Sequence, residues 1–203
     1  GRRNNDATEG AMNFPPEHMT RLYDSVRAIH STLEPEAALR LVVREAVSLV
    51  GASSGSLVLL NPNTGLLETE VAEGLPEADP ALRLEAGVAG WVVRHGESLR
   101  VGDAAGDERC AGARPGVHSE LAVPLRMEGS VRSVLRVDAT EADAFSETDQ
   151  ALLEELAVHA TQVIHNTWLY EQLRQRTELL ESLVSVGQTI NRTLKLDDVL
   201  EAI

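Results

Sequence analysis

The chain has 203 residues and a formal net charge of −14, because 32 acidic side chains outnumber 18 basic ones. This acidity excludes nucleic acid and an anionic membrane surface as direct partners, since both need a basic face on the protein. Aromatic residues make up only 3% of the chain and there is a single cysteine. These counts exclude a stacking platform for single-stranded nucleic acid, a disulfide framework and a multi-cysteine zinc site.

No stretch comes near the roughly 20 apolar residues of a membrane span, and residues 1–13 are polar, without the apolar core of a signal peptide. We therefore expect a cytoplasmic chain whose residues 1–14 are a flexible tail or a cloning remnant. Lys195 is the only lysine among the 18 basic residues, which favours a GC-rich bacterial genome as the source.

Two helices are predicted next. After Pro15 the apolar residues follow one helical stripe, formed by Leu22, Val26, Ile29 and Leu33. Pro35 ends that helix and suits the first turn of a second one, which Gly51 ends as a left-handed cap.

Short strands and one short helix occupy the middle of the chain. Residues 55–61 and 66–72 flank a four-residue turn and predict a β-hairpin. A short helix over 87–96 and a strand over 98–101 follow, and residues 102–116 form a loop with at most one helical turn. Residues 119–127 and 131–137 predict a second hairpin, in which Pro124 implies an edge position or a bulge.

From Ser146 onward the pattern is helical for about 40 residues, and Ser146 with Asp149 resembles a capping box. The second half has a stripe with alternating steps of 4 and 3: Leu169, Leu173, Arg176, Leu180, Leu183, Gly187 and Ile190. That period is typical of a coiled-coil seam, so we expect a homodimer through this helix. The alternative is an ordinary helix packed on its own domain.

The end of the chain repeats its beginning. Residues 29–39 and 190–200 align without gaps, and both contain the pattern I-x-x-T-L-x-x-[ED]-x-x-L. The simplest interpretation is that a second domain of the same kind begins after the long helix.

Several motifs in this order and spacing resemble those of the GAF domain family. They are the segments 49–60, 87–97 (G-V-A-G-W-V-V-R-H-G-E), 103–109 (D-A-A-G-D-E-R), 119–125 (S-E-L-A-V-P-L) and 145–149 (F-S-E-T-D). One position departs from the family pattern, since Ser133 stands where a glycine is usual, and we expect this to change local packing only.

The resemblance implies an α+β fold: a central antiparallel sheet of about five or six strands, with helices on one face. The other face, roofed by residues 75–118, holds the pocket in ligand-binding members. It also implies the division of the chain: a GAF domain over 15–167, a coiled-coil-like signalling helix over 168–182, and the first helix region of a truncated second GAF domain over 183–203.

Candidate ligand-binding residues lie in the predicted roof: Trp91, Asp107, Arg109, Cys110, Arg114 and His118. An arginine suits a small anionic metabolite, because it can bind a carboxylate with two hydrogen bonds. Asp103 and Asp107 are expected to cap a turn. Arg109 is expected either in a surface ion pair or at a ligand. A redox role for Cys110 needs a lowered pKa, which Arg109 and Arg114 could provide. No histidine pair has metal-ligand spacing, so neither a metal nor a cofactor is expected.

Two functions stay open. The first is a non-catalytic sensory domain of a bacterial signalling protein, of the histidine kinase or transcriptional regulator type, which binds a small molecule and transmits through a dimeric helix. The second is a dimerisation and transmission spacer with no ligand. Catalysis by the methionine sulfoxide reductases of the family needs several cysteines, and the chain has one.

Overall fold

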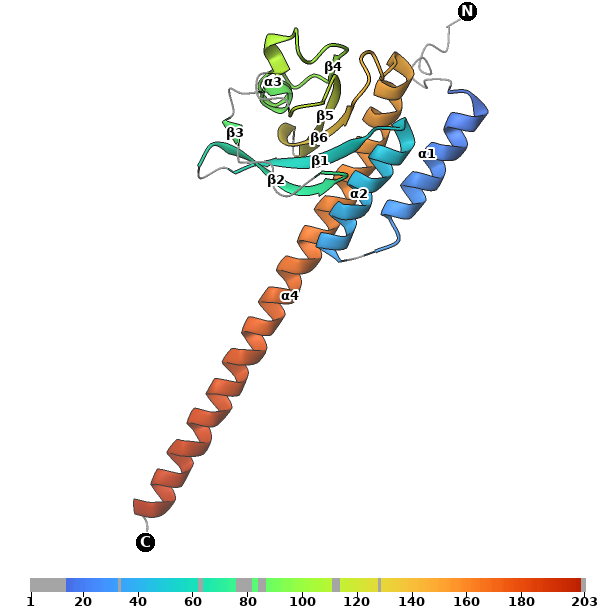
Figure 1. The fold of residues 1–203 in the computed structure, drawn as a ribbon. Helices are drawn as coiled ribbons and strands as arrows, with labels where there is room; N and C mark the ends of the chain where they lie inside the picture. Colours follow the sequence, from blue (N-terminus) through green and yellow to red (C-terminus); the bar gives the residue numbers. More distant parts are fainter. Residues whose placement is uncertain are drawn as a thin grey trace, which may run out of the picture.

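The computed structural model describes residues 14–32, 34–61, 64–75, 82–83, 87–110, 114–127 and 129–201. Its described part is a six-stranded antiparallel sheet with helices on both faces and one long helix that leaves the domain (Figure 1). The strands are β1 (Ser54–Leu60), β2 (Leu66–Glu73), β3 (Leu82–Arg83), β4 (Leu99–Val101), β5 (Ser119–Met127) and β6 (Ser130–Ala139). The helices are α1 (Pro16–Ile29), α2 (Pro35–Val50), α3 (Gly87–His95), the 3-10 helix η1 (Glu108–Cys110) and α4 (Glu147–Glu201). The predicted α+β class is confirmed.

The helix ends follow the predicted signals. α2 begins at Pro35 and ends at Gly51, whose φ of 68° is the left-handed conformation that a glycine adopts without strain. At the start of α4, Ser146 Oγ accepts a hydrogen bond from the Asp149 amide at 3.2 Å, and an Asp149 carboxylate oxygen accepts one from the Ser146 amide at 2.8 Å. The capping box is therefore confirmed.

The strands are ordered β3-β2-β1-β6-β5-β4, so the two predicted hairpins meet where β1 pairs with β6. Pro124 lies in β5, which is an interior strand, but the register with β6 shifts just after it, between Leu125 and Arg126, so the irregularity that was the second predicted alternative lies beside it. β4 is only three residues long and pairs with residues 120–122 alone. The side of β5 at Pro124 is therefore free of a neighbouring strand, which is why a residue without an amide hydrogen is tolerated there.

One face of the sheet, which we call the helix face, is covered by α2 and α4, with α1 packed on those two helices. Its core is apolar and includes Leu57, Leu121, Leu135, Leu153 and Leu156, each fully buried. The opposite face, which we call the roof face, is covered by α3, η1 and the connecting loops (Figure 1).

The long helix α4 packs on β5 with its first half and projects away from the domain with its second half (Figure 1). The helix is longer than the predicted 40 residues: it continues past Gly187 and ends at Glu201. No helix in the described ranges is long and apolar enough to cross a membrane. The division of the chain after residue 167 stays a prediction.

Candidate functional site

The roof face is divided into an apolar part and a polar part. Beneath α3 the space is filled by small and branched apolar side chains, namely Val58, Leu67, Val88, Ala89, Val92, Leu99, Val101, Ala122 and Val134. Trp91 is half-buried against this cluster and stacks on the ring of His95, with 4.1 Å between the ring centroids. Trp91 is thus engaged in packing against this apolar cluster and against His95.

The polar part lies beside it, where β1, β6 and β5 run next to one another. Ser54 pairs with Asp138, and Asp138 pairs with Glu120 on the next strand. One step along, Ser56 pairs with Arg136. All five are buried, and we call them, together with Arg114 from the roof, the polar cluster.

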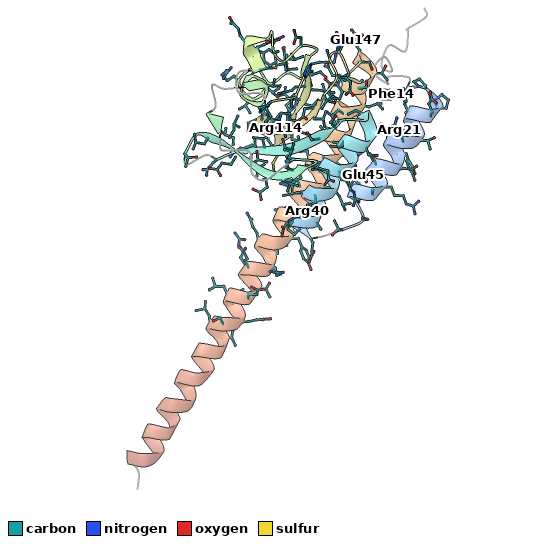
Figure 2. All side chains as sticks on the ribbon, in the orientation of Figure 1. Phe14, Arg21, Arg40, Glu45, Arg114 and Glu147 are labelled. Carbon is teal, nitrogen blue, oxygen red and sulfur yellow. The ribbon has the colours of Figure 1, made fainter. Side chains whose placement is uncertain are left out.

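Arg114 joins the roof to the sheet. Its Nη2 donates a hydrogen bond to Asp138 Oδ2 at 2.6 Å and another to Ser54 Oγ at 3.2 Å, while the Ser54 hydroxyl donates to the other oxygen of Asp138. Figure 2 shows Arg114 on the α3 side of the sheet, whereas Arg21 and Glu45 belong to helices of the opposite side. The Asp138 carboxylate is 5% exposed, so this ion pair is shielded from solvent.

Ser56 is the least satisfied member of the cluster. Its side chain is 1% exposed, and its Oγ has no hydrogen-bond partner among the described residues. A buried hydroxyl without a partner costs free energy, on the order of 1–3 kcal/mol. Such a group beside buried carboxylates and guanidinium groups marks a place where a polar ligand could complete the hydrogen bonding.

Cys110 faces the same region but lacks the properties of a redox thiol. Its side chain is buried, and burial raises the pKa of the thiol to about 12, with the carboxylates of Glu120 and Asp107 adding to the rise. Arg109 lowers this pKa, as expected, but its effect is smaller than the rise caused by burial and by the two carboxylates, so the net lowering that a redox role needs is absent. The thiol is therefore protonated at neutral pH and a poor nucleophile.

Asp107 and Arg109 form a local pair on the outside of the roof. Arg109 Nη2 lies 2.5 Å from Asp107 Oδ2, its Nε donates to Oδ1 at 2.9 Å, and its backbone amide donates to the same oxygen at 2.8 Å. The hydrogen bond from the Arg109 side chain lowers the pKa of the Asp107 carboxyl. The pair caps η1 beside an open depression of about 540 Å³, and Asp103 caps the turn before it.

His118 does not point into the roof face. Its side chain is exposed, while its backbone joins two segments: the amide donates to Ala139 O at 2.9 Å, and the carbonyl accepts from the Ala104 amide at 2.8 Å. The structure therefore brings only Cys110 and Arg114, of the six predicted site residues, next to the polar cluster. Ser133, which stands where the family usually has a glycine, is buried on the helix face between Leu59 and Leu125.

Sequence reasoning missed Ser54, Ser56, Glu120, Arg136 and Asp138. A signal for them exists, because Ser54 and Ser56 in β1, and Arg136 and Asp138 in β6, alternate with apolar residues. In a strand covered on one face this alternation indicates solvent-facing residues. Here both faces are covered, so the same pattern places polar groups in the interior.

The family model described as "GAF domain" matches residues 32–165, about two thirds of the chain. The chain belongs to the GAF domain family. Among solved structures, the GAF domain from an Acinetobacter phosphoenolpyruvate-protein phosphotransferase is similar with a TM-score of 0.69 and 22% identity, covering 77% of this chain and 97% of that one.

Two further proteins are similar to this GAF chain. Free methionine-R-sulfoxide reductase from Neisseria meningitidis, solved in complex with its substrate, has a TM-score of 0.70 and 22% identity, covering 75% of this chain and 91% of that one. A probable 3',5'-cyclic phosphodiesterase, pde-5 of Caenorhabditis elegans, is 26% identical over 172 residues. That alignment covers 76% of this chain but only 24% of the phosphodiesterase. The structural likenesses show a shared fold, which regulatory domains and an enzyme both use.

Proposed function

We propose that this chain is a non-catalytic regulatory GAF domain that binds a small polar molecule at the polar cluster and transmits binding through α4. The observation that carries the proposal is the buried polar cluster on the roof face, with the Ser56 hydroxyl lacking a partner among the described residues. Buried ionisable groups in a small domain are costly, and functional sites are where proteins retain them.

The thiol chemistry supports a role in binding over catalysis. Free methionine-R-sulfoxide reductase is named for an oxidation–reduction reaction, and such a reaction on a thiol needs an accessible, ionised cysteine. Cys110 is the only cysteine in the sequence, it is buried, and its pKa is raised to about 12.

The exposed side of α4 supports transmission through a dimer. The predicted seam positions Leu169, Leu173, Leu180 and Leu183 are between 46% and 62% exposed in the single chain. A leucine every three or four residues on an exposed helix face is the surface that a parallel coiled coil buries. A ligand at the sheet then biases two arrangements of the paired helices. We propose a cytoplasmic bacterial signalling protein, of the histidine kinase or transcriptional regulator type, as its setting.

A spacer without a ligand is the second candidate. The observation in its favour is the apolar filling beneath α3, where Val58, Val92 and Val134 are each 2% exposed or less. In this case the polar cluster only ties the roof to the sheet through Arg114 and Asp138.

A thermal-shift screen distinguishes the two candidates. The purified chain is heated with single members of a panel of amino acids, organic acids, nucleotides, cyclic nucleotides and heme. A ligand at 100 times its Kd raises the unfolding temperature by about 5–10 °C for a domain of this size.

A matched pair of variants then locates the binding. Arg114→Met removes a cation of the polar cluster, whereas Arg40→Met removes one from an exposed pair on α2. We expect the shift to disappear in Arg114→Met and to persist in Arg40→Met. A flat response across the panel contradicts the sensor proposal and supports the spacer. Both candidate functions include a dimer through α4, and light scattering that gave a monomer would contradict that dimer.

A further inference from the structure

Residues 102–110, which we call the roof loop, lie between the polar cluster and the segment that leads into α4. The loop begins directly after β4, where Val101 pairs with Glu120 of the cluster. It ends at Cys110, whose thiol pKa is raised by burial and by the Glu120 carboxylate. Elsewhere the loop contacts residues 140–146, which we call the connection because they join β6 to α4. The roof loop therefore adjoins both the candidate site and the helix that leaves the domain.

Two hydrogen bonds hold the connection against β4 and the roof loop. The Asp143 amide donates to Gly102 O at 2.9 Å, and Arg100 Nη1 donates to Phe145 O at 3.2 Å. Phe145 is 4% exposed and belongs to the core of the helix face, one residue before the cap Ser146. The connection is thus held by its backbone on one side and by an aromatic ring on the other, immediately before the first turn of α4.

The contact between Gly102 and Asp143 is close. A Cβ at position 102 would lie 1.9 Å from Asp143 Oδ1 and 3.0 Å from its Cγ, so any side chain at this position displaces the carboxylate. Asp143 has a φ of 51°, and no other non-glycine residue in the described part of the chain has a positive φ. Aspartate tolerates this left-handed conformation better than most residues. An uncommon backbone conformation is thus kept where the roof loop meets the connection.

The backbone of His118 ties the same loop to the end of β6. Its carbonyl accepts a hydrogen bond from the Ala104 amide at 2.8 Å, and its amide donates to Ala139 O at 2.9 Å. Arg114 lies four residues before His118, and its partner Asp138 lies one residue before Ala139. A change at the ion pair between Arg114 and Asp138 therefore bears directly on the residues that hold the roof loop.

We infer that the roof loop carries a change at the polar cluster to the beginning of α4, through the contact between Gly102 and Asp143. Both are positioning residues, because neither belongs to the polar cluster. The inference rests on the proposed function, in which a molecule bound at the cluster acts on α4. A second route exists along β6, whose chain runs from Asp138 into the connection. A measured coupling between substitutions distinguishes the two routes.

Hydrogen exchange at the beginning of α4 tests this coupling without a ligand. The Asp149 amide donates to Ser146 Oγ and the Gln150 amide to Ser146 O, so both report whether the first turn is closed. Arg114→Met is the perturbation at the cluster, since it removes the cation bound to Asp138. We expect it to speed the exchange of these two amides roughly 3- to 30-fold.

The Ala38 amide, which donates to Glu34 O at the start of α2, is the internal control. We expect its exchange to change much less than that of the two α4 amides in Arg114→Met. An equal acceleration at both helices would reflect a loss of overall stability and would overturn the inference.

Substitutions in the roof loop then test the route. Gly102→Ala pushes the Asp143 carboxylate away, and in this background Arg114→Met should change the exchange of the two α4 amides less than about twofold. Adding Asp143→Gly removes the carboxylate and keeps the positive φ, so the response to Arg114→Met should return. Gly106→Ala is the matched control, because its methyl group meets Asp103 within the loop, and the response should persist.

The other results each contradict the inference. The same response to Arg114→Met in the native and Gly102→Ala backgrounds places the route along β6. Loss of the response in Gly106→Ala as well, or no recovery with Asp143→Gly, shows that general loosening of the loop is responsible. No response to Arg114→Met in the native background removes the coupling itself. A flat ligand screen is a separate outcome, because no ligand enters this measurement.

Discussion

The helix face and the roof face of the sheet are built from the same strands but from different chemistry. On the helix face, every large side chain that β1, β5 and β6 turn toward α2 and α4 is apolar, as Leu57, Leu121 and Leu135 illustrate. On the roof face, the same strands bury Glu120, Arg136 and Asp138 beside apolar residues.

This difference separates what holds the domain together from what it is able to bind. Apolar burial on the helix face contributes to stability without regard to direction. The buried charges of the roof face contribute little net stability, because their desolvation offsets their attraction. Their arrangement is instead directional, which is what recognition of a polar molecule requires.

The largest expected effect concerns the helix face. Leu156→Ala leaves a cavity between α4 and the sheet and should lower the free energy of unfolding by about 2–5 kcal/mol. Val158→Ala, two positions along the same helix but 56% exposed, should change it by less than about 0.5 kcal/mol in the single chain. Urea denaturation measures both, and similar losses would contradict the assignment of the core face.

The next effect concerns the roof face. Arg114→Met leaves the buried Asp138 carboxylate without its cation and should cost about 1.5–3 kcal/mol. Arg40→Met breaks an exposed pair with Glu36 and should cost less than about 1 kcal/mol. If the two variants unfold at the same urea concentration, the ion pair beneath the roof is not shielded as described.

The pH dependence of unfolding tests the environment of Cys110. The thiol ionises near its usual pKa of 9.0 in the unfolded chain but near 12 in the folded one. The folded state therefore holds the proton more tightly, and stability falls as pH rises from about 9 toward 12, by at most about 1.4 kcal/mol per pH unit.

Cys110→Ala is the control for this pH series, because the alanine does not titrate. Its stability should be lower near pH 7 but should fall less steeply above pH 9. An identical slope in both proteins would show that the thiol is not buried as the structure places it.

The smallest effect concerns the beginning of α4. Ser146→Ala removes the acceptor for the Asp149 amide and should cost about 1 kcal/mol. Ser130→Ala, which removes an exposed hydroxyl at the first residue of β6, is the matched control and should be close to neutral. Thermal unfolding of the two variants checks the difference.

The sequence allowed most of the fold to be predicted, because its signals are local. Pro35 and Gly51 bound α2, and Ser146 with Asp149 begins α4, through contacts within a few residues. The sequence left open whether Pro124 lies at an edge or at a bulge, because its tolerance depends on the length of β4, a strand that precedes it by more than 20 residues.

The candidate site was harder to predict, because it is assembled across strands. Glu120 and Asp138 become neighbours only through the register of β5 and β6, and Arg114 reaches them from the roof. Asp107 and Arg109 were conspicuous as a motif, yet they bind each other on the surface. Residue type and spacing indicated the roof but not which side chains turn inward.

The central claim is that binding at the polar cluster changes the paired α4 helices. It is tested most directly by the rate at which Leu180→Cys forms a disulfide across the dimer, with and without a saturating amount of the compound that gives the largest thermal shift. We predict that the compound changes this rate several-fold, and that Arg114→Met abolishes the change. An equal rate with and without a bound compound would contradict transmission through α4.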